Sequence, residues 1–191
     1  MGGLVAVGYF LFTLFFSLLT AVLWIRIGLR YFRVSTLHPV SYANNSLTNP
    51  LITPISRLIP ASKTRLSRYD WACFILLVVI EFLKFTLLSL LFLTAMMPLL
   101  LLVIYVLADL IIEPCNLLFY AIIIRVIMSW VNPAWQHPVA DILRICTEPL
   151  LRLGRRIVPD VFGFDFSPFI VLVILKIITL FIRASLPLQL I

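Results

Sequence analysis

The chain has 191 residues, of which 63% are hydrophobic and only 12% are charged. A water-soluble domain of this length needs a polar surface, which the long uncharged stretches of this sequence do not supply. Composition therefore excludes a soluble globular domain and predicts an all-α membrane protein. The formal charge of +7 is typical of nucleic-acid-binding proteins and of membrane proteins whose loops face anionic lipid, so the position of the cations must decide between them.

Four segments are apolar enough and long enough to cross a bilayer, which takes about 20 residues. They cover residues 4–25, 71–93, 98–130 and 166–186. The third is longer than one crossing and contains Pro114, so we expect a tilt, a kink near this proline or a first turn outside the membrane. The first cation of the chain follows the first apolar stretch, so this stretch lacks the basic start of a signal peptide and is expected to remain as a span.

The cations gather in two places. Of the fifteen Lys and Arg residues, seven lie in residues 26–68 and five in residues 125–156. Both stretches follow odd-numbered spans, so they lie on one side of the membrane, and the positive-inside rule makes that side cytoplasmic. We therefore expect loops 26–70 and 125–165 in the cytoplasm, both termini on the opposite side, and no nucleic-acid partner.

The second half of the chain repeats the first at an offset of 99 residues. At this offset His38-Pro39 matches His137-Pro138, Arg26 matches Arg125, and LTNPLITPISRLIP (47–60) lies over CTEPLLRLGRRIVP (146–159). Several matches in one register indicate a duplication. The sequence thus predicts two domains, residues 1–95 and 96–191, each a span, a basic loop and a span. Because each has an even number of spans, the two-helix repeats share one orientation.

Each loop carries the pattern of a helix lying on the membrane surface. In the second loop, Thr147 is expected to cap a helix that Glu148 and Pro149 begin and Pro159 ends. Apolar side chains recur there at helical spacing with arginines between them, which favours an interfacial helix over the alternative, a solvated linker. Thr53-Pro54 makes the helix of the first loop shorter or kinked.

We call the two basic loops together the basic platform, and we expect this platform to contact anionic lipid or partner proteins. The residues predicted to do so are Thr147, Glu148, Pro149, Leu150, Arg152, Arg155, Arg156 and Pro159 in the second loop, and Thr48, Pro50, Arg57 and Pro60 in the first. Their arginines would meet lipid phosphates of the cytoplasmic leaflet.

The second repeat also carries a family resemblance, in Ser129, Trp130, Thr147, Glu148, Pro149, Leu150, Arg156, Pro159, Asp165, Phe166, Ser167 and Pro168. With these residues nearly the whole chain resembles the YggT family of bacterial membrane proteins, also called YlmG. The first repeat departs from the pattern, for example at Asn49, which stands where the second has Glu148. The resemblance implies a protein of the bacterial cytoplasmic (inner) membrane with no known catalytic residues. In that membrane the termini, which the positive-inside rule places opposite the loops, are periplasmic. The resemblance further implies roles in osmotic or potassium homeostasis, proximity to cell-division genes and, in organelle relatives, a link to membrane-complex assembly.

Five ionisable residues fall inside the predicted spans: Glu81, Lys84, Asp109, Glu113 and Lys176. Charges at such positions are costly and mark functional candidates. We interpret them as an interhelical polar cluster that fixes helix packing, with Lys84 or Asp109 reaching toward an interface. An ion or proton path is the alternative.

Motifs of catalysis and metal binding are absent from the sequence. GxSxG, HExxH and P-loop patterns do not occur, and the three cysteines have no CxxC spacing. His38 and His137 precede prolines, which favours a turn over a metal site. We therefore expect no enzyme activity, no cofactor and no metal, and small apolar roles for the cysteines.

These features predict a non-enzymatic scaffold or assembly factor that recruits anionic lipids and membrane or division proteins at its basic platform. The alternative is a small ion transport or channel protein that acts under osmotic stress. Two spans per repeat make a thin bundle, which leaves room for a homo-oligomer.

Overall fold

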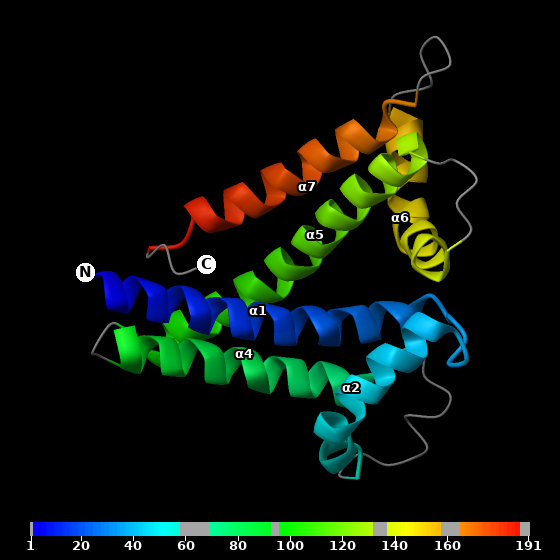
Figure 1. Cartoon of the computed structure of the whole chain (residues 1–191). Coiled ribbons are helices and arrows are strands. Elements are labelled where there is room, and N and C mark those ends of the chain that lie inside the picture. Colours follow the sequence, from blue (N-terminus) through cyan, green and yellow to red (C-terminus); the bar gives the residue numbers. More distant parts are fainter. Residues whose placement is uncertain (1, 58–68, 93–95, 132–136, 158–164, 188–191) are drawn as a thin grey trace.

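The computed structural model describes residues 2–57, 69–92, 96–131, 137–157 and 165–187. These residues form α1 (Gly3–Tyr31), α2 (Pro39–Ser56), α4 (Trp71–Phe92), α5 (Leu99–Val131), α6 (Pro138–Ile157) and α7 (Ser167–Ala184) (Figure 1). Among them α1, α4, α5 and α7 are long and apolar enough to span a membrane. The predicted all-α class with four spans is therefore confirmed.

The helices form two units of the same design. In each unit the first span (α1 or α5), the loop helix (α2 or α6) and the second span (α4 or α7) contact one another. Figure 1 shows α1 and α5 running from the end that holds both termini toward the end that holds α2 and α6, while α4 and α7 run back. The two repeats therefore share one orientation, and both loop helices lie at one end of the bundle, which we call the loop end.

The units meet through α4 against α5, α1 against α5 and α6, and α2 against α6. Buried apolar side chains fill the first unit between α1, α2 and α4, among them Leu23 and Leu77. Tyr105 and Phe85 fill the junction of α4 with α5. A third cluster around Ile122 joins α5, α6 and α7. Partly buried Leu110 of α5 packs on both the first and the second of these clusters, so the α4–α5 contact joins the repeats.

Both loop helices begin earlier than expected. α6 starts at Pro138, and Nδ1 of His137 accepts a hydrogen bond from the Val139 amide at 3.2 Å. α2 likewise starts at Pro39, directly after His38. Proline at the first helical position loses no intrahelical bond, so the repeated His-Pro pair marks the true start of each helix.

The expectation that Thr147 caps a helix begun by Glu148 and Pro149 is therefore wrong. Thr147 lies in the middle of α6, and its hydroxyl donates to the carbonyl of Leu143 at 2.6 Å. Pro149 is an interior proline of this helix. The predicted ends at Pro60 and Pro159 lie outside the described residues.

The first and third spans are longer than one bilayer crossing. α1 continues past the expected end at residue 25 to Tyr31, so Arg26 and Arg30 are helical residues. α5 runs through Pro114 without interruption for 33 residues. At 1.5 Å per residue α5 measures about 50 Å, against about 30 Å of hydrocarbon. Its last turns therefore have the length to reach the loop helix beyond the hydrocarbon.

Gly154 marks the closest approach of α6 to α7. A Cβ atom at this position would lie 2.9 Å from Cγ2 of Val171 and 3.0 Å from the carbonyl oxygen of Ser167. Gly28 in α1 has no atom within 4 Å of its Cβ position. The two glycines thus make a matched pair, one at a helix crossing and one in open space.

Gly154→Ala should lower the thermal unfolding temperature of the detergent-solubilised protein, followed by tryptophan fluorescence. Overpacking costs about 1–3 kcal/mol, which exceeds the roughly 0.8–1.0 kcal/mol that alanine gains over glycine in a helix. Gly28→Ala should leave that temperature unchanged or raise it. Equal stabilisation by both substitutions would contradict the described packing of α6 on α7.

Candidate functional site

In each repeat an arginine near the loop end of the first span reaches a threonine of the loop helix. Nη1 of Arg26 donates to Oγ1 of Thr48 at 2.5 Å, and Nη1 of Arg125 donates to Oγ1 of Thr147 at 2.8 Å. Both threonines are buried, and each hydroxyl donates to a carbonyl one turn earlier in its own helix. We call this repeated pair of hydrogen bonds the arginine–threonine contact. It ties α2 to α1 and α6 to α5 at equivalent positions.

In the first repeat a buried aspartate completes the contact. Asp70 forms ion pairs with Nε of Arg26 at 3.2 Å and with Nη1 of Arg30 at 3.3 Å. Its other oxygen accepts a hydrogen bond from the backbone amide of Cys73 at 3.3 Å, at the start of α4. Arg26 also donates to Oδ1 of Asn49 at 2.8 Å. Asp70 therefore joins the first span, the loop helix and the second span.

In the second repeat two acids, Glu148 and Asp165, pair with the arginines in place of a single aspartate. Glu148 accepts from Nη2 of Arg125 at 2.7 Å and pairs with Arg152 and Arg155 at 3.4 and 3.3 Å. Asp165 pairs with Nε of Arg155 at 3.4 Å and accepts from the Ser167 amide at 2.8 Å. The second repeat thus holds α6 with a chain of alternating charges rather than with one aspartate.

The pKa values of these two carboxyl groups follow from their partners. The hydrogen bond from Arg125 lowers the pKa of Glu148 below its ordinary value of 4.5. Burial alone would raise the pKa of Asp165, but the hydrogen bonds from Ser167 and the charge of Arg155 lower it. Both groups are therefore ionised near neutral pH, and their stabilising effect is lost only as the pH falls below the usual carboxyl range.

The outer face of α6 carries more cations than these acids neutralise. Arg125, Arg144, Arg152 and Arg156 line a groove of about 630 Å³ together with one acid, Glu148, and with Ile145 and Leu153. Arg144, Arg152 and Arg156 are exposed, Arg152 with 75% of its side chain. Within the described residues no carboxylate pairs with Arg144 or Arg156. We call this surface the basic groove.

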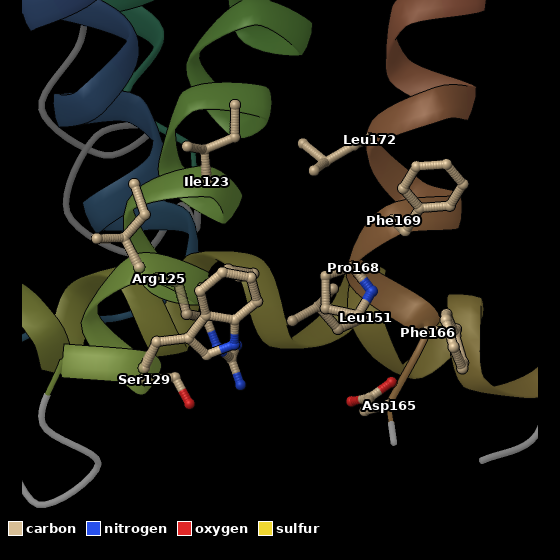
Figure 2. A pocket seen from close by; sticks show the side chains of 12 residues that line it. Ile123, Arg125, Ser129, Leu151, Asp165, Phe166, Pro168, Phe169 and Leu172 are labelled. Carbon is tan, nitrogen blue, oxygen red and sulfur yellow. The ribbon is translucent and has the colours of Figure 1, made fainter. Parts of the chain in front are cut away.

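A second groove, of about 820 Å³, lies between α5 and α7 where they meet α6, and we call it the interfacial groove. Figure 2 shows Ser129 and Asp165 at its loop end and Ile123, Phe169 and Leu172 further along the spans. The interfacial groove is therefore polar at one end and apolar along the rest, as is a phospholipid.

The charges inside the spans do not all lie in one cluster. Lys84 of α4 forms ion pairs with Asp109 of α5 and, at 3.2 Å, with Glu81 of its own helix. Glu113 accepts a hydrogen bond from the hydroxyl of Ser17 in α1 at 3.2 Å. Lys176 instead lies over the ring of Phe119, with its ammonium 5.3 Å from the ring centroid.

Two expectations about these charges need correction. Lys84 and Asp109 do not reach toward an interface, because both side chains are buried against each other between α4 and α5. Within the described part of the chain no ion pair joins Lys176 to the other four residues. Its place inside a span predicts that Lys176 is in the membrane but not which face of its helix it occupies.

The remaining predicted loop residues lie along α2 and α6. Pro50 is inside α2, and exposed Arg57 directly follows its last residue. Leu150 packs on the apolar cluster that joins α5, α6 and α7. Arg26, Arg125, Asp70 and Asp165 were not among the predicted site residues. Their identity in the two aligned repeats was the signal that could have found them, because a charge that recurs at the end of a span needs a partner in both copies.

The profile of the CCB3/YggT family matches this chain twice, over residues 5–91 and 100–186. The chain belongs to the CCB3/YggT family. Each match contains one arginine–threonine contact, while the predicted domain boundary between residues 95 and 96 stays a prediction. The family resemblance expected from the sequence is thereby confirmed.

Relatives of this YggT-family chain occur in several bacteria. It is 30% identical over 173 residues to "Uncharacterized protein YggT" of Escherichia coli (strain K12), covering 90% of this chain and 86% of that protein. It is 31% identical over 159 residues to a protein of Vibrio alginolyticus, 83% of each chain. A Pseudomonas aeruginosa protein shares 39% identity over 64 residues, 34% of this chain and 32% of its own. No solved structure matches the chain.

A double-mutant cycle on Arg125→Met and Thr147→Val tests the arginine–threonine contact. Each substitution should speed hydrogen exchange of the α6 amides, and the two effects should be non-additive by about 0.5–3 kcal/mol, as for residues in one hydrogen-bond network. Arg156→Met combined with Thr147→Val is the control and should be additive, because Arg156 is exposed on the outer face of α6. Additive effects for Arg125 with Thr147 would show that the contact does not hold α6.

Proposed function

We propose that this YggT-family protein is a non-enzymatic scaffold of the bacterial inner membrane that binds anionic phospholipid headgroups at its loop end. It recruits membrane proteins of complex assembly or cell division to that surface. Loops 26–70 and 125–165 face the cytoplasm and the termini face the periplasm. The observation that carries the proposal is the basic groove, in which Arg144, Arg152 and Arg156 are exposed on α6, a helix held against the spans by hydrogen bonds and ion pairs.

The chemistry of the basic groove suits a lipid phosphate. Guanidinium groups bind phosphate oxygens through paired N–H donors, and they are more weakly hydrated than ammonium groups. Each cation near an anionic membrane surface contributes about 1 kcal/mol. Exposed Leu153 and Ile145 line the same groove and can enter the acyl boundary while the guanidinium groups remain at headgroup level.

Aromatic side chains support the placement of the loop end at a membrane surface. Trp130 at the end of α5, and Tyr31, Tyr69 and Trp71 around the α1–α4 junction, are exposed. Tyrosine and tryptophan gather at membrane–water interfaces because their rings are both apolar and polar. The interfacial groove opens at the same level, so a lipid whose phosphate meets Arg125 has apolar walls for an acyl chain beside it.

The pairing of charges favours docking over catalysis. The carboxylates of Asp70, Glu148 and Asp165 are held by arginines and serve to position helices. A general base would need an unshared lone pair near a substrate. The cytoplasmic orientation rests on the gathering of arginines in both loops.

Lipid-dependent stability of the purified protein tests the proposal. Phosphatidylglycerol should raise the thermal unfolding temperature of the native chain in neutral detergent more than phosphatidylcholine does. Replacement of Arg144, Arg152 and Arg156 by glutamine should remove most of the difference, since about 3 kcal/mol, or on the order of 100-fold in affinity, is lost. Arg183→Gln is the matched control, because Arg183 lies in the last turn of α7, away from the loop end, and should keep the difference.

Two results would overturn the proposal. One is an equal phosphatidylglycerol effect in the triple variant and the native chain. The other is robust, selective ion flux through the native chain in proteoliposomes, which a scaffold does not predict.

A further inference from the structure

Two buried carboxyl groups lie between the two repeats. Glu81 of α4 is 0% exposed and Asp109 of α5 is 1% exposed. Both carboxyl groups form ion pairs with the ammonium of Lys84. Three ionisable groups thus share one site that excludes water and lipid alike.

The charges of this site do not balance if every group is ionised. Two carboxylates would face one ammonium, which leaves one negative charge without a partner. An uncompensated charge in a medium of low dielectric is far less stable than its neutral form. Glu81 follows Trp71 by ten residues, about 15 Å along the helix at 1.5 Å per residue, so the site is deep within the hydrocarbon layer.

The remaining carboxyl oxygens of Glu81 and Asp109 also indicate that the site binds a proton. Oε1 of Glu81 and Oδ1 of Asp109 are buried, and neither has a hydrogen-bond partner among the described residues. A proton on one carboxyl group removes the unpaired negative charge and turns an acceptor into a donor.

We propose that Glu81 and Asp109 form a proton-binding site that holds one proton between them at neutral pH. The bound species is a proton rather than a metal ion. Sodium and potassium need several oxygen ligands, and the described residues contain no group of three His, Cys, Asp or Glu side chains that could hold a metal. The ammonium of Lys84 already occupies the position of a cation between the two carboxyl groups.

The other ionisable groups near the pair lie on each helix packed around it. Glu113 is on α5, one turn from Asp109, and accepts a hydrogen bond from Ser17 of α1. Tyr9 of α1 interacts with the charge of Lys84, and Arg183 of α7 interacts with Glu113. Glu113 is partly exposed and has its own donor, so it is separate from the shared proton.

Infrared difference spectroscopy of the native chain and Glu81→Gln tests the site. The native chain at neutral pH should show the carbonyl stretch of a buried protonated carboxyl group, shifted in heavy water, and Glu81→Gln should lack it. Glu113→Gln is the control and should retain this band. A spectrum of the native chain without such a band, or a band unchanged in Glu81→Gln, would overturn the proposal.

Stability provides an independent readout. Glutamine has the shape of a neutral glutamic acid, so Glu81→Gln should fold. Below the ordinary carboxyl range its unfolding temperature should be close to that of the native chain, because the acid is then protonated in both the folded and the unfolded state. Between that range and neutral pH, unfolding of the native chain releases the bound proton, so its unfolding temperature should fall increasingly below that of Glu81→Gln as the pH rises. Failure of Glu81→Gln to fold would also contradict the proposal, because a site built for a neutral acid must accept this amide.

Discussion

The arginine–threonine contact, made once in each repeat, decides where the two loop helices lie. A guanidinium near the end of a span cannot leave the membrane interface without losing its polar partners, and the buried threonine offers it one on the loop helix. Because the threonine sits mid-helix, the contact fixes the rotation of the helix as well as its position. The rotation in turn decides which arginines of α6 face outward, so the basic groove depends on a hydrogen bond within the protein.

The two repeats have the same arrangement of helices, but different acids pair with their arginines. The first closes its contact with one buried acid, Asp70, and the second spreads it over Glu148 and Asp165 among several arginines. The surplus of exposed cations is consequently found on α6. The buried charges follow no such repetition, since Lys84 and Asp109 come from the α4–α5 contact between the units. The duplication therefore accounts for the shared arrangement of helices. The basic groove and the buried carboxyl pair depend on residues that differ between the two repeats.

Much of this structure could be predicted from the sequence, because composition and repeated residues indicate the spans and their order, but they do not indicate the rotation of each helix. Uncharged stretches near bilayer length and the register of the His-Pro pairs were enough for the spans, the duplication and the common orientation of the repeats. The predicted start of α6 is wrong because proline suits a first turn, so both Pro138 and Pro149 are candidates, and the contact of Arg125 with Thr147 shows that Thr147 is an interior residue. The partners of Lys84 and Lys176 depend on helix rotation, which apolar periodicity does not encode when a helix is hydrophobic all round.

The central claim is that a duplicated unit places both loop helices on one face of the membrane. Single cysteines in place of Tyr42 of α2, Arg156 of α6 and Met96, between the second and third spans, test it most directly in a chain without native cysteines, because all three positions are exposed. With a membrane-impermeant maleimide, the cysteines at positions 42 and 156 should react only in inside-out vesicles, and that at position 96 only in right-side-out vesicles. Labelling of positions 42 and 156 from opposite faces would contradict the account.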